Sequence, residues 1–475
     1  MNRRTFIRAA MATAAAARVA PHLLSAQSAQ QPLQLTPMRA TLAINESQTL
    51  ATVPQDFMGL SYESAQLANP AFFDATNKAL IELFRELSHD GVLRLGGGTS
   101  EFTHFTTEEP AGQAPFDAVG PDTSKNVKTD TPITPKSLQN LRAFLDAANW
   151  RCLYGLNAAR GPVANAVEEA IYAQHILGPR LIAFQLGNEP DAWRNRYRPA
   201  SWSYPDYWRE WSAMHAAIIA KLPQAKFAGP DVSNKMAYVT GFAEDVKKSA
   251  PDVVLLTWHY YAMGPAGAKG ITIDKLLSPD PKLARDLEIA QAASRTAGIP
   301  FRMSEGNSCW NGGQAGVSDT LASALWCADV CLQFAAAGSA GVNFHGGGNG
   351  YYTPIAGSLE AGFQRRPEFW GMRLAKAFVG GTLLKTTLDC ESDRVRVYAG
   401  QNHGFVLVLA INQTERSVSI KLPFTYTDEQ WRLYGPAADA KDHIAIAKSS
   451  ATAFHNGVLT VEPYTAILVP RIEEK

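Results

Sequence analysis

The stretch LIAFQLGNEP, residues 181–190, joins an apolar run to a glutamate that stands between an asparagine and a proline. Continuous apolar runs of this length are typical of strands that are buried on both faces of a parallel sheet. A buried strand gains nothing from a carboxylate, so Glu189 belongs either to a surface turn or to a place where chemistry occurs. The rest of the chain decides between these two interpretations.

Seven further runs resemble this one, and helical patterns lie between most of them. Apolar residues recur at three- and four-residue spacing in 77–90, 137–150, 164–177, 204–222 and 320–338, which predicts helices. Strands that alternate with helices form βαβ units, and eight units predict an α/β fold with a closed (β/α)8 TIM barrel. An open doubly wound sheet is the alternative, but the chain has no phosphate-type glycine motif. The eight runs are 57–64, 91–98, 151–158, 181–189, 225–231, 253–261, 300–307 and 340–348.

The pattern changes after the eighth unit. Apolar and polar residues alternate in the last hundred residues, which predicts a C-terminal antiparallel β-sandwich. The segment MRATLAI (38–44) has the same alternation, and we expect it to pair into that sandwich. The long segment 99–135 lacks periodicity and should overhang the barrel mouth. The predicted parts are 1–29 (export signal), 30–50 (N-terminal strand of the sandwich), 51–375 (barrel) and 376–475 (sandwich).

The N-terminus resembles a twin-arginine export signal. Arg3 and Arg4 precede an Ala-rich apolar stretch, and small residues that suit cleavage end at Ala26 and Ala29. We therefore expect an exported protein, either periplasmic or secreted. No later stretch approaches the ~20 apolar residues of a membrane span, so no membrane association is expected after the signal is removed.

Composition narrows the classes of partner. Lys and Arg together number 44, as do Asp and Glu, and this balance argues against nucleic acid as the main partner. The five cysteines have irregular spacing without a zinc-ligand pattern, and Cys327 and Cys331 lie in an apolar helical pattern typical of buried thiols. We expect no metal, no cofactor and a monomer.

Polar residues gather at the C-terminal ends of the predicted strands, where barrel enzymes hold their catalytic groups. Glu189 ends the fourth strand and Glu305 ends the seventh, so the two carboxylates should face each other across the mouth. The other polar residues at these ends are Glu63, Arg94, Asn157, Asn188, Asp231, His259, Tyr261, Asn307 and His345.

Two facing carboxyl groups suit the cleavage of glycosidic bonds, in which one protonates the leaving oxygen while the other attacks or activates water. A separation of about 5–5.5 Å gives retention of configuration, and about 6.5–9.5 Å gives inversion. We expect Arg94 and Tyr261 among the substrate-binding residues. Both could also keep Glu305 ionised, which would give the two acids the different environments they need. Either glutamate alone could be a turn residue, but the pair at two strand ends predicts catalysis.

LGNEPD and RMSEGNS in such a barrel resemble the clan A retaining glycoside hydrolases. FMGLSYES, LRLGGGTSEF, LTWHYY and VNFHGGGNGYYTPI are most similar to family 79, which contains heparanase and β-glucuronidases. The resemblance covers essentially the whole chain after the signal. It implies these roles: Glu189 as acid/base, Glu305 as nucleophile, Asn188 at the sugar 2-hydroxyl, Glu63 at hydroxyls on the far side of the ring, Tyr261 on the nucleophile and Tyr352 at a uronic carboxylate.

One position departs from the family pattern. Bacterial relatives carry a tyrosine for the carboxylate in the loop after the nucleophile, where this chain has Trp310, whose indole offers one N–H donor and no hydroxyl. We also find no dense Lys/Arg cluster of the kind that an endo-acting enzyme on heparan sulfate needs, because 363–369 (FQRRPEF) supplies only a small basic patch.

The resulting prediction is a retaining exo-β-glucuronidase that acts on β-glycosides or oligosaccharides, with or without a 4-O-methyl group on the glucuronic acid. The same machinery with a neutral glycone, as in a β-glucosidase or β-xylosidase, is the first alternative. A non-catalytic carbohydrate-binding barrel and a metal-dependent hydrolase that uses His259 and His345 are alternatives of other classes.

Overall fold

A computed structural model describes residues 36–108, 130–347, 350–424, 430–449 and 454–471. The expected export signal lies outside these residues, as does the middle of the segment 99–135. Within the described ranges, no helix combines the length and the apolar character that crossing a membrane requires.

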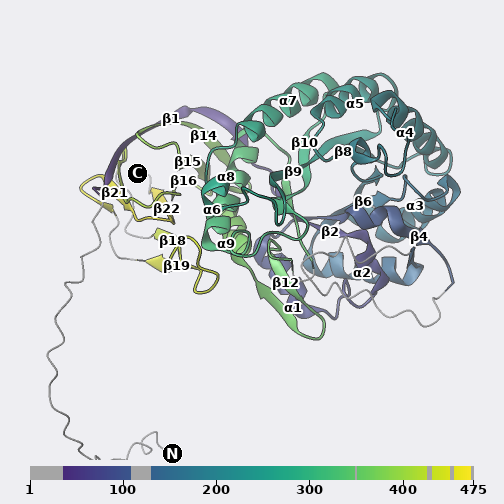
Figure 1. Cartoon of the computed structure of the whole chain (residues 1–475), viewed down its shortest axis with the longest axis horizontal. Helices are drawn as coiled ribbons and strands as arrows, with labels where there is room; N and C mark the ends of the chain where they lie inside the picture. The colour runs from purple at the N-terminus through teal and green to yellow at the C-terminus, as the bar shows by residue number, and fades with distance from the viewer. Residues whose placement is uncertain (1–35, 109–129, 348–349, 425–429, 450–453, 472–475) are drawn as a thin grey trace, which may run out of the picture. The chain divides into compact units, whose positions relative to one another are not determined.

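The eight predicted strands form a closed parallel barrel, which confirms the predicted fold class (Figure 1). Around the barrel the strands follow chain order, with the last one closing against the first, as βαβ connections require. The strands are β2 (Met58–Glu63), β3 (Val92–Gly96), β6 (Arg151–Leu156), β7 (Leu181–Leu186), β8 (Phe227–Val232), β9 (Val253–Pro265), β10 (Phe301–Trp310) and β11 (Val342–His345).

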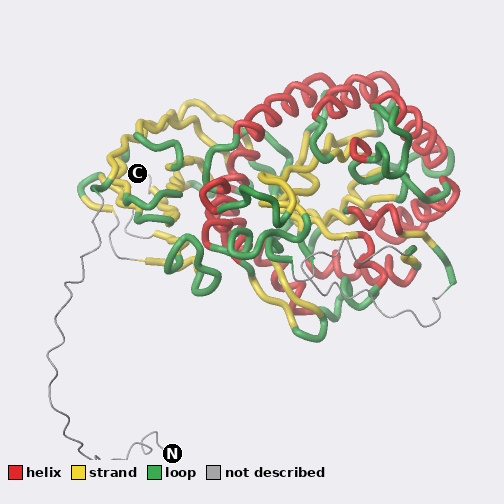
Figure 2. The backbone as a smooth tube through the Cα atoms, viewed as in Figure 1, coloured by secondary structure: helices red, strands yellow, loops and turns green. Residues whose placement is uncertain are grey.

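Helices surround these strands (Figure 2). Helix α2 shows why they begin and end where they do: Thr134 accepts the Ser137 N–H, Pro135 occupies the first turn, and Asn149 ends the helix in the left-handed region. The helices are α1 (Lys78–Leu87), α2 (Pro135–Ala148), α3 (Val163–Leu177), α4 (Tyr204–Ile219), α5 (Met236–Ser249), α6 (Ile273–Leu276), α7 (Pro281–Ala297), α8 (Leu321–Ala336) and α9 (Pro367–Ala375).

Two small sheets lie in the connections: β4 (Thr103–Phe105) pairs with β5 (Thr131–Ile133), and β12 (Ile355–Ser358) forms a hairpin with β13 (Gly362–Arg365).

The second large sheet combines both ends of the described chain. Strand β1 (Met38–Thr52) pairs antiparallel with β14 and parallel with β17, so MRATLAI joins the sheet as predicted. The sheet is mixed and not wholly antiparallel, because no hairpin joins β1 to β17 and fixes its direction. The other strands are β14 (Thr382–Cys390), β15 (Val395–Asn402), β16 (Phe405–Asn412), β17 (Val418–Lys421), β18 (Gln430–Tyr434), β19 (Ala445–Ser449), β20 (Phe454–His455), β21 (Val458–Val461) and β22 (Thr465–Arg471).

The loop between β18 and β19 contacts the start of α8. The first N–H groups of a helix lack partners within the helix, and the Thr320 side chain does not cap α8. Carbonyl groups of this loop supply the partners: Leu321 N donates to Ala440 O at 2.8 Å, and Ala322 N donates to Ala438 O at 2.9 Å. A loop of the second sheet therefore supplies hydrogen-bond acceptors for the first N–H groups of a barrel helix.

Candidate active site

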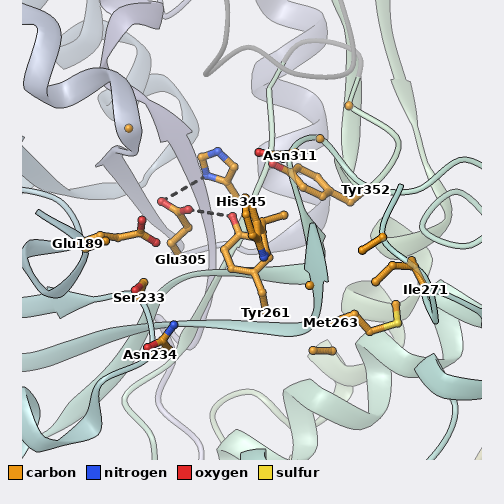
Figure 3. Close-up of a pocket in the computed structure, with 18 of the residues that line it drawn as sticks. Glu189, Ser233, Asn234, Tyr261, Met263, Ile271, Glu305, Asn311, His345 and Tyr352 are labelled. Atoms are coloured by element: carbon orange, nitrogen blue, oxygen red, sulfur yellow. Dashed lines mark hydrogen bonds and ion pairs between the residues drawn. The ribbon is translucent and has the colours of Figure 1, made fainter. Parts of the chain in front are cut away.

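A pocket of about 1030 Å³ opens at the C-terminal ends of the barrel strands. Figure 3 shows Glu189 and Glu305 at one end of the view, with Met263 and Ile271 toward the other end and Tyr261 between them. Both glutamates line this pocket, so the position of Glu189 answers the question raised by its sequence: it belongs to the site and not to a solvent-facing turn.

The backbone after β7 turns sharply to present Glu189. Gly187 and Glu189 both have positive φ, of 85° and 50°, and a Cβ at Gly187 would collide with the Trp193 ring. Two hydrogen bonds hold the turn, from Glu189 N to Asp231 O at 2.9 Å and from Asn188 N to Glu101 Oε1 at 2.7 Å. A non-glycine residue in the left-handed region at this point is typical of a functional site.

Glu305 lies within β10 and does not end it, which corrects the predicted position. The strand continues to Trp310 because β9 extends to Pro265 and pairs with it along that length. Tyr261 Oη donates to Glu305 Oε1 at 2.8 Å, and Arg94 Nη1 donates to Oε2 at 2.5 Å. These are the two contacts that the sequence predicted for this carboxylate.

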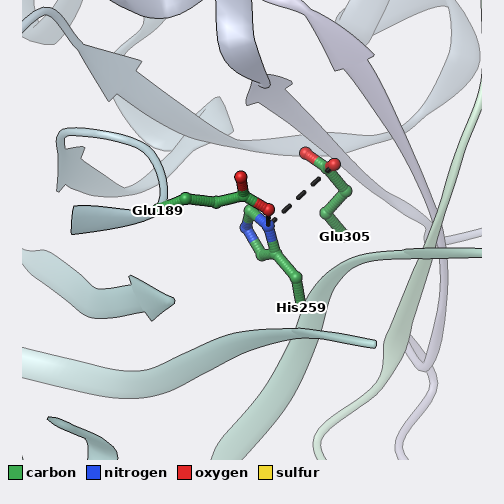
Figure 4. A group of neighbouring side chains, drawn as sticks. All are labelled: Glu189, His259 and Glu305. Atoms are coloured by element: carbon green, nitrogen blue, oxygen red, sulfur yellow. Dashed lines mark hydrogen bonds and ion pairs between the residues drawn. The ribbon is translucent and has the colours of Figure 1, made fainter. Parts of the chain in front are cut away.

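The two carboxylates approach closely. Strands β7 and β10 are separated around the barrel by β8 and β9, so they are not directly opposite as the sequence suggested. Even so, one oxygen of Glu189 and one of Glu305 lie within 4.8 Å of each other and of a His259 ring nitrogen (Figure 4). This close approach agrees with the short carboxyl separation of retaining glycosidases.

Their surroundings separate the two acids chemically. Burial alone would raise the pKa of Glu305, but the positive charges of His345, His259 and Arg94, together with the Tyr261 hydrogen bond, outweigh it and lower the pKa to about 2. For Glu189, burial is the largest influence and raises the pKa, against an opposing hydrogen bond from His259. One acid is thus held ionised while the other is biased toward its protonated form.

His259 is buried and contacts carboxylates through both ring nitrogens. Nδ1 lies 3.0 Å from Glu189 Oε1, and Nε2 lies 3.2 Å from Asp231 Oδ2. Burial disfavours its charge, but the negative charges of Glu305 and Asp231 prevail and raise its pKa to about 10.

The same three side chains, Glu189, His259 and Glu305, lie close enough together to bind a cation. A histidine ligand must offer a lone pair, however, and both His259 nitrogens carry protons in its charged form. Arg94 also occupies Glu305 with a second positive charge. This donor set therefore fits a proton network better than a metal ion.

Four other predicted residues line the pocket. Glu63 Oε2 accepts hydrogen bonds from Thr99, at 2.8 Å from N and 2.6 Å from Oγ1. Asn188 Oδ1 accepts a hydrogen bond from Arg94 Nη2 at 2.8 Å, so the NH2 group of Asn188 points away from Arg94. Tyr352 is 8 % exposed with its ring centroid 6.0 Å from that of His345, and Trp310 is 46 % exposed at the rim.

Arg94 differs from the expectation that it binds substrate. It is 1 % exposed and is absent from the described pocket wall. Its guanidinium donates hydrogen bonds to Ser61, Gln185, Asn188, Asp231 and Glu305. It acts beneath the pocket and holds the groups that face it.

Two features escaped the sequence reasoning. Glu101 is buried and accepts N–H groups from Ala158, Ala159 and Asn188, which ties the Glu189 turn to the loop after β6. The described pocket wall also collects four cations, one from the loop after β7 and three from the segment 269–282. They are Arg196, Lys269, Lys275 and Lys282.

Comparison with known proteins yields relatives of one kind. The chain is 26 % identical to a β-glucuronidase of Aspergillus niger over 414 residues, which cover 77 % of this chain and 74 % of the fungal one. It is 22 % identical to a heparanase of Gallus gallus, over 82 % of this chain and 84 % of the other. No family model matches.

Solved structures share the architecture. A 4-O-α-L-rhamnosyl-β-D-glucuronidase of Fusarium oxysporum superposes with a TM-score of 0.71 at 18 % identity, over 91 % of this chain and 99 % of that chain. A GH51 arabinofuranosidase of Xanthomonas axonopodis superposes with a TM-score of 0.65 at 12 % identity, over 91 % and 99 %. Identities this low show the fold alone. The motifs and the sequence relatives, which are glycoside hydrolases, make the chain similar to glycoside hydrolases of the β-glucuronidase and heparanase kind.

Proposed function

We propose that the protein is a retaining, exo-acting β-glucuronidase that removes terminal β-D-glucuronic acid, with or without a 4-O-methyl group. The observation that carries this proposal is the pair Glu189 and Glu305, whose oxygens lie within 4.8 Å and whose pKa values are shifted in opposite directions. Retention requires one acid and one nucleophile at this spacing.

In the first step, a Glu305 oxygen bonds to the anomeric carbon while Glu189 gives its proton to the leaving oxygen, and the aglycone departs as an alcohol. Loss of that proton leaves Glu189 ionised. In the second step Glu189 takes a proton from water, whose oxygen attacks the anomeric carbon and releases Glu305. The product keeps the β configuration, because each step inverts the carbon once.

An acidic substrate agrees with the charges around the pocket. Arg196, Lys269, Lys275 and Lys282 line its wall beside the acids Glu63, Glu189 and Glu305, so the wall offers positively charged partners for a substrate carboxylate. Tyr352 lines the same pocket at the position that, by resemblance, helps to hold the uronic acid. The fungal relative's name, β-glucuronidase, points to the same glycone.

A neutral glycone is the second candidate, and one observation favours it. Trp310 is 46 % exposed at the rim where relatives place a tyrosine, and an indole cannot supply a hydroxyl to a carboxylate. An exposed aromatic ring suits the apolar face of a neutral sugar equally well.

Hydrolysis of a panel of aryl β-glycosides tests both candidates: the glucuronide, 4-O-methylglucuronide, glucoside, xyloside and galactoside. Glu305→Ala runs beside the wild type, with NMR of the first-formed product to read its configuration. Preference for either glucuronide, a β product and an inactive variant are the expected results. Preference for a neutral sugar would select the second candidate. Activity that survives in Glu305→Ala would exclude the proposed nucleophile, and the carbohydrate-binding alternative requires a wild type that binds these sugars without cleaving any.

We further propose that the protein is exported through the twin-arginine signal at 1–29 and works as a monomer on free or oligomeric β-glycosides. Edman sequencing of exported protein should begin after Ala26 or Ala29, and light scattering should give the mass of one chain. An unprocessed N-terminus or a dimer mass would contradict these two points.

A further inference from the structure

Two basic side chains meet beneath the pocket, and both are cationic at neutral pH because the pKa of His259 is raised to about 10. Arg94 Nη2 lies 3.4 Å from His259 Nε2, and both side chains are buried. Two positive charges this close repel strongly where water is excluded. An anion must therefore hold them together.

Asp231 supplies that anion. Its Oδ2 accepts from Arg94 Nη2 and lies 3.2 Å from His259 Nε2, so one oxygen serves both cations. Its Oδ1 accepts from Gln185 Nε2 at 2.5 Å and from Ser304 Oγ. With 1 % exposure and no place on the described pocket wall, Asp231 does not reach a substrate.

Each cation that Asp231 holds also contacts one catalytic carboxylate. His259 Nδ1 lies 3.0 Å from Glu189 Oε1, and Arg94 Nη1 lies 2.5 Å from Glu305 Oε2. A continuous chain of contacts thus runs from Glu189 through His259, Asp231 and Arg94 to Glu305. Asp231 is its midpoint.

We propose that Asp231 is a positioning residue for both catalytic glutamates, because it keeps His259 charged and aimed at Glu189 while it fixes Arg94 against Glu305. This inference rests on the proposed roles of the two glutamates. Asp231 differs from a merely structural acid because, together with Glu305, it supplies the negative charge that keeps His259 protonated.

Removing the charge of Asp231 should lower the pKa of His259. The groups that face His259 are Glu189, Asp231 and Glu305, which are acidic, and Arg94, which is basic. Asp231→Asn removes one acid and leaves the guanidinium in place. Arginine stays protonated in proteins, so His259 is the group that gives up its proton. Glu189 and Glu305 then lose a positive neighbour at neutral pH.

NMR of histidine-labelled, full-length protein tests this without any substrate. The His259 imidazole signal, assigned by its loss in His259→Gln, should stay in the charged form up to about pH 9 in the wild type and titrate near neutrality in Asp231→Asn. Glu169→Gln is the matched control: it removes a buried barrel carboxylate that contacts Tyr154 on the outer side of the strands, and its His259 signal should follow the wild type. An unchanged His259 titration in Asp231→Asn overturns the proposal.

The pH dependence of kcat/KM gives the second readout. Asp231→Asn should lose about 100-fold near pH 7, and the loss should shrink toward pH 5 as His259 regains its proton. Asp231→Glu, which keeps the charge, should restore part of the activity. A loss that is equal at all pH values would mean general damage and would contradict the proposed role. If Asp231→Asn does not fold, Ser304→Ala gives a further check: it removes one donor from Asp231 but leaves the Asp231 charge in place, so His259 should stay charged over the same pH range, and a titration near neutrality would contradict the proposal.

The two proposals fail differently. If the glycoside panel shows no hydrolysis, the proposed function is wrong, yet the NMR titration still reports whether Asp231 sets the charge of His259. If the panel succeeds and the titration does not respond to Asp231→Asn, only the role of Asp231 is lost.

Discussion

At the scale of single residues, the main feature of the site is that Glu189 and Glu305 have the same side chain but pKa values shifted in opposite directions. The sequence could predict the pair Glu189 and Glu305, and also Tyr261 as a partner of Glu305, because strand ends in a barrel converge. It could not predict that His259 contacts Glu189, because that contact depends on how far each strand is shifted along its neighbour. Register is set by packing over the whole barrel and leaves no local sign in the chain.

Tyr261→Phe should move the acid limb of kcat/KM to higher pH. The Tyr261 hydrogen bond favours ionised Glu305, so its loss raises the pKa of Glu305, and the fraction of ionised nucleophile falls as pH decreases. We expect a shift of about one pH unit. Tyr260→Phe is the control, because it removes a neighbouring hydroxyl that donates to Asp280 away from the pocket. Equal profiles for the wild type and Tyr261→Phe would remove Tyr261 from this role.

Trp310→Tyr should raise the preference for the glucuronide over the glucoside by about tenfold, which is the value of one hydrogen bond to a charged group. The added hydroxyl would stand at the pocket rim, where the indole is 46 % exposed. Trp310→Phe supplies the ring without the hydroxyl and should not show this gain. Kinetics of both variants on the two aryl glycosides measure the ratio, and a gain in Trp310→Phe as large as in Trp310→Tyr would assign the effect to ring size.

At the scale of elements, the eight strands could be predicted because buried parallel strands are continuous apolar runs. The end of β10 could not, since the polar residues of its second half resemble a loop in sequence. Asn307 and Ser308 are fully buried there, and Asn307 Nδ2 donates to His345 O at 3.0 Å. Tertiary hydrogen bonds thus make a strand of residues that local preference assigns to a turn.

Helix α3 carries a buried acid whose titration should be visible in stability. Burial raises the pKa of Glu169 to about 7, against the opposing hydrogen bond from Tyr154. A raised folded-state pKa adds stability that is complete below the unfolded value of 4.5 and is lost as pH rises through 7. Glu169→Gln cannot titrate, so its unfolding free energy relative to the wild type should rise by up to about 3 kcal/mol between pH 4.5 and pH 8. Urea unfolding of both proteins at the two pH values measures this, and a constant difference would contradict it.

At the scale of the whole molecule, distant segments come together in ways that sequence distance hides. Arg196 lies more than seventy residues before the three lysines of the segment 269–282, so the sequence does not show that these cations meet, yet all four line one pocket. The loop between β18 and β19 likewise accepts hydrogen bonds from the first N–H groups of α8, although it lies more than a hundred residues further along the chain. The alternation in 38–44, by contrast, was enough to assign β1 to the second sheet.

Deleting residues 37–52 should prevent the accumulation of soluble protein, although both proposed catalytic glutamates remain. Strand β1 pairs with β14 on one side and β17 on the other, so its loss divides the sheet and leaves two unpaired edges. Deleting residues 2–35, with cytoplasmic expression of both proteins, is the control. Soluble fraction and size-exclusion profiles compare them, and a soluble, active protein without β1 would show that the sheet closes by itself.

The position of β1 also sets an order of events during synthesis. The ribosome makes this strand first, but its partners β14 and β17 begin at Thr382 and Val418, on the order of half a minute later. During that time the barrel can form while the face that carries Met38, Ala40 and Leu42 has nothing to cover it. A truncated translation product that stops before β14 would contain both proposed catalytic glutamates and still display an open strand edge. Both edges of β1 become paired only when the chain extends through β17.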